Sequence, residues 1–165
     1  MTDQRWTKFS ITADFTTDVR TIYNAWTTQA GLEHWFLRKA EFYAIAGRTR
    51  EADEHIKKED SYFWQWHGYT DDVNEKGEIL EANDSDLIKF TFTKGSVVTI
   101  DLQRRNGLTL LELTHENIPI EEDPLKNLYV QCQVGWTFYL ANLKSIIAGG
   151  PDLRNRRYDI PSIFK

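Results

Sequence analysis

One long apolar stripe near the C-terminal end constrains the fold of this chain more than any other feature. Apolar residues recur at steps of three and four between positions 124 and 147, and Gly149-Gly150-Pro151 follows them. This spacing predicts a helix of about seven turns, roughly 37 Å long, that opens at Pro124 and that Gly149 terminates. The stripe consists of Leu125, Leu128, Tyr129, Cys132, Trp136, Tyr139, Leu140, Leu143, Ile146 and Ile147. A helix of this length with one apolar face must pack against a broad surface.

Short strand-like segments supply that surface. Apolar and polar residues alternate over 9–15, and further strands are expected at 39–44, 62–69, 78–82, 87–93, 97–103 and 108–115. Turn signals separate the later segments, at 74–77, at 94–96 and at Asn106-Gly107. These links are too short for parallel crossovers, so the sequence predicts an antiparallel sheet.

Two short helices are expected between the first two strands. Thr17 or Asp18 can cap the first helix, and Thr28 begins the second. The segment 47–60 is almost entirely charged, with Ile56 as its only large apolar residue. We therefore interpret 47–60 as a solvated connection or a short surface helix, outside the core.

Together these elements predict an α+β fold, with a curved antiparallel sheet of about seven strands, two short helices and a long C-terminal helix. A long helix cannot lie flat along a strongly twisted sheet, so a cavity is expected between them. The 165-residue chain is expected to form one domain over 1–165. In its C-terminal tail at 157–165, the apolar residues Tyr158, Ile160, Ile163 and Phe164 are expected to dock back onto the body.

Charge and composition exclude several classes of partner. The net charge of −5 argues against nucleic-acid binding, which depends on neutralising phosphates. The sequence has no apolar run of about 18 residues that could span a membrane. Cys132 is the only cysteine, so neither an internal disulfide nor a thiolate metal cluster is expected. Because the N-terminal residues are polar and lack the apolar segment of a signal peptide, we expect a cytoplasmic protein.

The order of the expected elements, together with three stretches of sequence, resembles a known family. The first is Ala25-Trp26-Thr27-Thr28 with Gly31-Leu32 and Trp35-Phe36, and the second is Leu113-Thr114-His115-Glu116 with Ile118-Pro119. The third is Gly135-Trp136 through Tyr139-Leu140, with Leu143-Lys144 and then Gly149-Gly150. Over roughly residues 8–154 the chain resembles the helix-grip or START-like superfamily, also called SRPBCC. Within it the chain is similar to the Aha-type branch, named after a domain of an activator of a heat-shock chaperone ATPase. The resemblance implies a helix-grip fold.

The sequence offers little catalytic chemistry. It contains no HExxH, GxSxG, P-loop or GxGxxG motif, and no local spacing suits a metal site. His67 and His115 lie on expected strands, where each is either a base or polar contact in the cavity or a structural histidine. Cys132 is either a small core residue or a nucleophile facing the cavity. We assign no catalytic residue, metal ligand or cofactor.

The expected cavity lining combines strand residues with one face of the long helix. The candidates are Trp64, Trp66, Phe90, Phe92, Ile100, Leu102, Leu111, Leu113, His115, Tyr129, Cys132, Trp136 and Tyr139. Aromatic residues make up 13% of the chain, and their rings either fill the core or line a pocket with a few polar contacts. The sequence leaves these two alternatives open.

The leading hypothesis is a non-enzymatic domain that holds a small apolar or amphipathic molecule between sheet and helix. The resemblance implies two alternatives. One is an interaction module that assists a chaperone, and the other is a pocket enzyme of the kind found among the cyclases and hydrolases of the wider superfamily. The sequence indicates neither the ligand nor the oligomeric state.

Overall fold

The computed structural model describes residues 4–157 and 159–160. Its N-terminal half contains η1 (Gln4–Trp6), β1 (Phe9–Phe15), α1 (Val19–Thr27), α2 (Gln29–Trp35), β2 (Lys39–Tyr43), β3 (Ser61–Gln65) and β4 (Asn74–Ala82). Its C-terminal half contains β5 (Leu87–Phe92), η2 (Thr93–Gly95), β6 (Ser96–Arg105), β7 (Leu108–Glu116), η3 (Pro124–Lys126) and α3 (Leu128–Ile147). None of the described helices is both long enough and apolar enough to cross a membrane.

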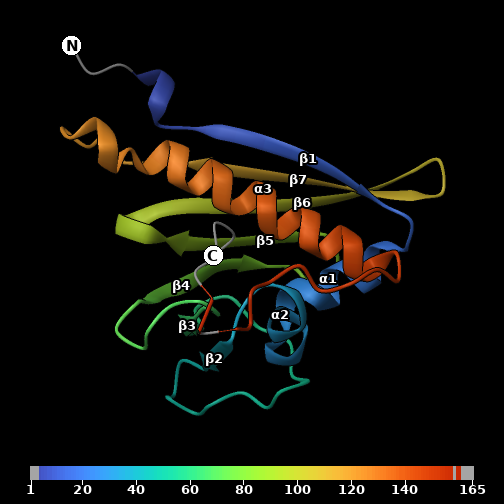
Figure 1. Ribbon diagram of the computed structural model, residues 1–165. Coiled ribbons are helices and arrows are strands. Elements are labelled where there is room, and N and C mark those ends of the chain that lie inside the picture. The colour runs from blue at the N-terminus through green and yellow to red at the C-terminus, as the bar shows by residue number, and fades with distance from the viewer. Residues whose placement is uncertain (1–3, 158, 161–165) are drawn as a thin grey trace.

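The strands form one curved, seven-stranded sheet in the order β1-β7-β6-β5-β4-β3-β2, and every pairing is antiparallel. The α3 helix crosses one face of this sheet, while α1 and α2 lie near one of its ends (Figure 1). This arrangement confirms the predicted α+β fold and the helix-grip architecture.

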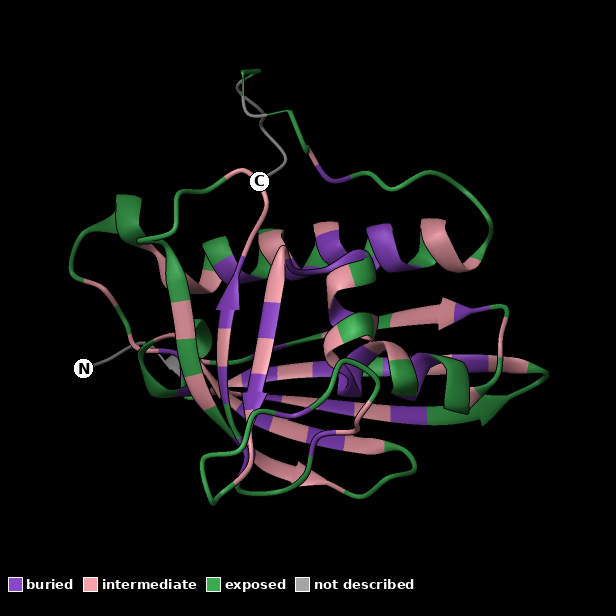
Figure 2. Ribbon diagram, turned by 90° about the horizontal axis from the view of Figure 1, so that it is seen from below, coloured by how far each residue is buried: buried purple, intermediate pink, exposed green. Residues whose placement is uncertain are grey.

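Local capping explains where the two short helices begin. Asp18 accepts a hydrogen bond from the Thr21 amide at 2.7 Å, and Thr28 accepts one from the Gly31 amide at 2.9 Å. Both residues were expected as helix starts, and both act as N-caps. Figure 2 shows buried and more exposed positions alternating along the strands, as expected for a sheet with one face against the core.

The β4 strand changes partners along its length. Its first half, 74–78, pairs with β3, and its second half pairs with β5, with a register shift between Ile79 and Glu81 inside that pairing. Tyr62 lies opposite Gly77, where an added Cβ would come within 2.5 Å of the Tyr62 ring. The Tyr62 hydroxyl donates to the Thr91 carbonyl oxygen of β5 at 2.6 Å. A tyrosine side chain therefore bridges the point where β4 and β5 separate.

This arrangement corrects the prediction of a turn at 74–77 and of a strand over 62–69. Residues 74–77 belong to β4, and Gly77 makes room for an aromatic ring instead of forming a turn. The β3 strand ends at Gln65, so the connection to β4 is the loop at 66–73. Trp66 therefore lies on a loop and not on the strand that carries Trp64.

The long helix begins later than predicted. Pro124 opens the short 3₁₀ turn η3, and the backbone of Asn127 is not helical. The Asn127 side chain then accepts a hydrogen bond from the Val130 amide at 3.1 Å and caps α3. Leu125, counted in the predicted stripe, is consequently 90% exposed.

The charged segment 47–60 contributes to the core, contrary to prediction. It contains no helix, and Arg50, Ile56 and Asp60 are buried. The Arg50 guanidinium donates to both carboxylate oxygens of Asp60, at 2.5 and 2.9 Å. Pairing makes the burial of two charged groups tolerable here, and composition alone does not reveal such pairing.

The chain after α3 turns back and packs against α2. The buried Arg154 guanidinium donates to the carbonyl oxygens of Glu33, His34 and Leu37 at 2.8 to 3.1 Å, and it pairs with Asp152 at 2.8 Å. These carbonyls lie at the end of α2, where a cation is favourable. Ile160 is 46% exposed, and the predicted docking of Tyr158, Ile163 and Phe164 lies outside the described residues.

Candidate functional site

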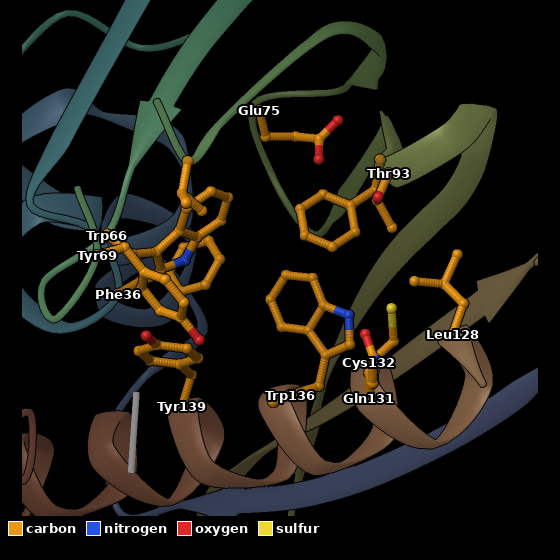
Figure 3. Close-up of a pocket in the computed structure, with 13 residues that line it drawn as sticks. Phe36, Trp66, Tyr69, Glu75, Thr93, Leu128, Gln131, Cys132, Trp136 and Tyr139 are labelled. Atoms are coloured by element: carbon orange, nitrogen blue, oxygen red, sulfur yellow. The ribbon is translucent and has the colours of Figure 1, made fainter. Parts of the chain in front are cut away.

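A cavity of about 250 Å³ opens between α3, the loop at 66–73, the start of β4 and the end of β5 (Figure 3). Its size lies just below the range of roughly 300–1,000 Å³ that is typical of small-molecule sites. Its lining is mostly apolar and consists of Phe36, Trp66, Tyr69, Val73, Glu75, Phe92, Thr93, Leu128, Gln131, Cys132, Gly135, Trp136 and Tyr139. The predicted cavity between sheet and helix is therefore present, next to a densely filled core.

Packed aromatic rings form the inner wall of this cavity. The Trp136 ring centroid lies 5.1 Å from that of Phe36 and 5.2 Å from that of Phe92. Phe36 also contacts Tyr139 edge to face at 5.0 Å and Trp66 at 5.8 Å. Because each ring is held by others, the wall is preorganised for a flat or apolar molecule.

The loop at 66–73 forms the opposite wall, and Arg38 holds it in place. The Arg38 guanidinium pairs with Asp71 at 2.6 Å and donates to the carbonyl oxygen of Trp66 at 3.3 Å. The Gln65 side-chain amide donates to the Asp71 carbonyl oxygen at 3.1 Å. These contacts fix the loop from which Trp66 and Tyr69 reach the cavity.

One face of α3 closes the cavity from the helix side. Leu128, Cys132, Gly135 and Tyr139 follow one another at steps of three and four residues, so they share this face. A Cβ added at Gly135 would meet no atom within 4 Å. Gly135 therefore leaves open space where any other residue would fill it.

The cavity contains few polar groups. Glu75 is the only charged residue among the described residues of the lining, and burial raises the pKa of this carboxyl group while a hydrogen bond from Thr93 opposes the rise. Burial raises the pKa of the Cys132 thiol to about 12, so this side chain is a neutral thiol at physiological pH. Among the described residues, no three His, Cys, Asp or Glu side chains are grouped to hold a metal ion.

The structure divides the sequence candidates into two sets. Trp66, Phe92, Cys132, Trp136 and Tyr139 line the cavity. Away from the lining lie the buried residues Trp64, Phe90, Ile100, Leu102, Leu111, Leu113 and His115, together with Tyr129, which packs against Trp6 and Phe9. Sequence reasoning missed Phe36, Tyr69, Val73, Glu75, Thr93, Leu128, Gln131 and Gly135. The helical period of α3 could have identified Leu128, Gln131 and Gly135, which share a face with Cys132.

His115 is a buried link behind the aromatic wall. The Trp136 indole N–H donates to its Nδ1 at 3.3 Å, so its Nε2 carries the proton and donates to the Ser96 hydroxyl at 2.7 Å. Ser96 in turn donates to the Thr93 carbonyl oxygen at 2.8 Å. Both ring nitrogens are therefore engaged within the protein, which favours the structural interpretation of this histidine.

This buried histidine predicts a pH-dependent stability. Burial lowers the pKa of His115 to about 4, below its ordinary value of 6.5. Between these values the unfolded chain binds a proton that the folded chain excludes, so stability is full above pH 6.5 and decreases as the pH falls. The expected slope is about 1.4 kcal/mol per pH unit from this one group.

Denaturant unfolding of the wild type and of His115→Gln between pH 6.5 and 4.5 measures this contribution. Burial also lowers the pKa of His67 to about 4, so the wild-type slope contains both histidines and only the difference belongs to His115. An identical slope in both proteins would show that His115 takes up its proton without unfolding.

A sheet that grips one long helix, with a cavity between them, defines a START-like or SRPBCC protein. Within this class, a family model described as Activator of Hsp90 ATPase homolog 1-like protein matches residues 16–148, and the chain belongs to this family. The predicted resemblance to the Aha-type branch is thereby confirmed. A search of curated protein sequences gives no significant match.

Several solved structures are similar to this fold. The protein SSP2350 from Staphylococcus saprophyticus has a TM-score of 0.68 and 16% identity, covering 89% of this chain and 96% of its own. An HSP90 activator from Plasmodium falciparum, PFC0360w, has a TM-score of 0.62 and 21% identity, covering 88% and 98%. The Aha1 dimer from Colwellia psychrerythraea has a TM-score of 0.65 and 14% identity, covering 85% and 95%. Identities this low establish the shared fold alone.

Proposed function

We propose that this protein, acting as one domain, binds a small apolar or amphipathic molecule in the cavity between α3 and the sheet. The observation that carries the proposal is the preformed cavity of about 250 Å³ with its mostly apolar wall. Burial of a ligand against such a wall is favourable because it removes apolar surface from water. The cytoplasmic location expected from the sequence is part of the same proposal.

The polar groups at the cavity would orient such a molecule. Glu75 and Thr93 lie on one side, and Gln131 lies on α3 across from them (Figure 3). A few polar contacts in an apolar wall favour an amphipathic molecule over a pure hydrocarbon. Among the described residues, the cavity holds no activated nucleophile, since burial keeps the Cys132 thiol protonated and His115 lies behind Trp136. We therefore propose binding without catalysis.

A side chain placed at Gly135 is expected to block the site. Gly135→Phe extends a ring from α3 into open space, so the fold is retained while the cavity is filled. Titration with naphthalene, indole and 1-octanol, followed through the indole N–H signals of Trp66 and Trp136, measures binding. We expect Gly135→Phe to weaken the tightest of these complexes by about tenfold or more, which corresponds to 1.4 kcal/mol.

Gly135→Ala is the matched control, because it adds one carbon at the same position and leaves most of the cavity open. It should bind the same compound as the wild type does, and both variants should melt cooperatively. Saturable binding that Gly135→Phe leaves unchanged would place the ligand elsewhere. Failure of the wild type to bind any of the three compounds at millimolar concentration would count against the proposal.

The family description supports a second candidate, an interaction with the chaperone Hsp90. The similar Plasmodium falciparum structure carries the description HSP90 activator. Capture of Hsp90 by this protein, together with faster ATP hydrolysis by the captured chaperone, would favour this function. If Gly135→Phe keeps that activity, the chaperone contact does not depend on the cavity.

A further inference from the structure

The position of Glu75 distinguishes this cavity from a purely apolar one. Glu75 is half-buried on the first half of β4, and none of the described residues that line the cavity with it is cationic. Within the described part of the chain, Glu75 forms no ion pair with a lysine or arginine. Burial raises the pKa of the Glu75 carboxyl group, and hydrogen bonding by Thr93 opposes this rise only in part. A partly desolvated carboxylate without a cation is unfavourable. A cationic ligand that pairs with Glu75 would therefore bind more tightly than a neutral one.

The carboxylate faces the helix across the cavity. Figure 3 shows Glu75 and Trp136 on opposite sides of the same space, with their side chains directed into it. The charge of Glu75 is also one cause of the raised pKa of the Cys132 thiol on α3. Its field therefore extends through the space that a ligand would occupy.

Aromatic rings line the cavity together with this carboxylate. Trp66 and Tyr69 reach it from the loop, and Trp136 and Tyr139 reach it from α3 (Figure 3). Phe92 of β5 also lines it. The faces of aromatic rings carry partial negative charge and attract cations within about 6 Å. The rings and the carboxylate thus both favour a positive charge on a bound molecule. The net protein charge of −5 adds to this preference.

We propose that the ligand of this cavity is a small organic cation, in which a protonated or methylated amine lies between Glu75 and the aromatic rings. The inference rests on the ligand-binding function proposed above and specifies its ligand class. The ammonium group donates to the Glu75 carboxylate or lies against it, while the apolar part of the molecule packs on Trp136 and Phe36. A carboxylate or phosphate ligand would meet repulsion from Glu75 and find no cation in the lining.

Three compounds in which a phenyl ring and two methylene groups carry different polar ends test the proposal. 2-Phenylethylammonium, 2-phenylethanol and 3-phenylpropionate differ in charge, and each is titrated at pH 7.5 while the Trp66 and Trp136 indole signals are followed. We expect the ammonium compound to bind at least about tenfold more tightly than the alcohol, and the carboxylate compound to bind most weakly.

Glu75→Gln removes the charge and keeps the size of the side chain. This variant should lose about tenfold in affinity for 2-phenylethylammonium and stay within about threefold of wild type for 2-phenylethanol. Glu78→Gln changes an exposed residue of the same strand and should leave all three affinities unchanged.

The possible outcomes separate this inference from the function on which it rests. Equal wild-type affinities for the ammonium compound and the alcohol would overturn the cation inference while binding in the cavity stands. An ammonium preference that persists in Glu75→Gln would overturn the role of Glu75. Absence of binding by all three compounds would overturn the cation inference alone if naphthalene, indole or 1-octanol still binds, and both proposals if none of those compounds binds either.

Discussion

Asp60→Ala is expected to lower the free energy of unfolding by about 3 kcal/mol, among the largest effects of any single substitution in this protein. Asp60 is 1% exposed, and Arg50 beside it is 8% exposed. Removing the carboxylate leaves most of the buried guanidinium without its partner, since among the described residues its remaining side-chain contact is with Glu54 at 2.5 Å. The Lys57 amide, which donates to Asp60 at 2.8 Å, also loses its acceptor.

Chemical denaturation of Asp60→Ala and of the double variant Arg50→Met/Asp60→Leu measures this effect. The double variant removes both charges together, so it should be clearly more stable than Asp60→Ala. If Asp60→Ala unfolds at the same denaturant concentration as the wild type, the charged segment is not anchored in the core.

Trp136→Ala is expected to cost about 3–5 kcal/mol, near the lower end of that range. The Trp136 side chain is 3% exposed and packs against Trp26, Phe36 and Phe92. The cost is reduced because the ring already borders an open cavity, so part of the void exists in the wild type. The same truncation enlarges the cavity and should admit bulkier ligands.

Two further variants separate packing from hydrogen bonding at this position. Trp136→Phe keeps an aromatic ring but leaves His115 Nδ1 without its donor, which should cost about 1–3 kcal/mol. Val134→Ala, on the exposed side of the same helix, should change stability by less than about 0.5 kcal/mol. Thermal and denaturant unfolding would contradict the structure if Trp136→Ala had as small an effect as Val134→Ala.

The periodic parts of the sequence predicted the fold well. The stripe through Cys132, Trp136 and Leu140 identified the buried face of α3, because a helix of this length displays one face to the sheet. Asn106 and Gly107 both have positive φ values, of 52° and 78°, as their predicted hairpin turn requires. Each of these features depends on residues that are close together in the chain, so the sequence alone predicts it.

The errors arose where a residue acts through a distant partner. Gly77 was interpreted as part of a turn, although it is glycine because the Tyr62 ring lies against its backbone. Asp60 was assigned to solvent, although Arg50 neutralises it in the interior. The sequence alone does not show which distant residues pair. The predicted bounds of the neighbouring elements were therefore wrong as well.

The candidate site was predictable in part for the same reason. Trp136 and Tyr139 follow from the helical stripe, whereas Tyr69 and Val73 lie on a loop that was interpreted as strand. Glu75 reaches the cavity only because β4 begins where a turn was expected. Whether aromatic rings fill a core or leave a cavity depends on how β4 and β5 separate, which composition does not reveal.

Native mass spectrometry of the protein purified from the organism that makes it shows directly whether the cavity beside α3 holds a ligand. We expect the wild type to carry a small bound molecule, seen as a mass above that of the chain, and Gly135→Phe purified in parallel to have the mass of the bare chain. The bare mass in both proteins, or the same added mass in both, would contradict the claim that the cavity beside α3 is a ligand-binding site.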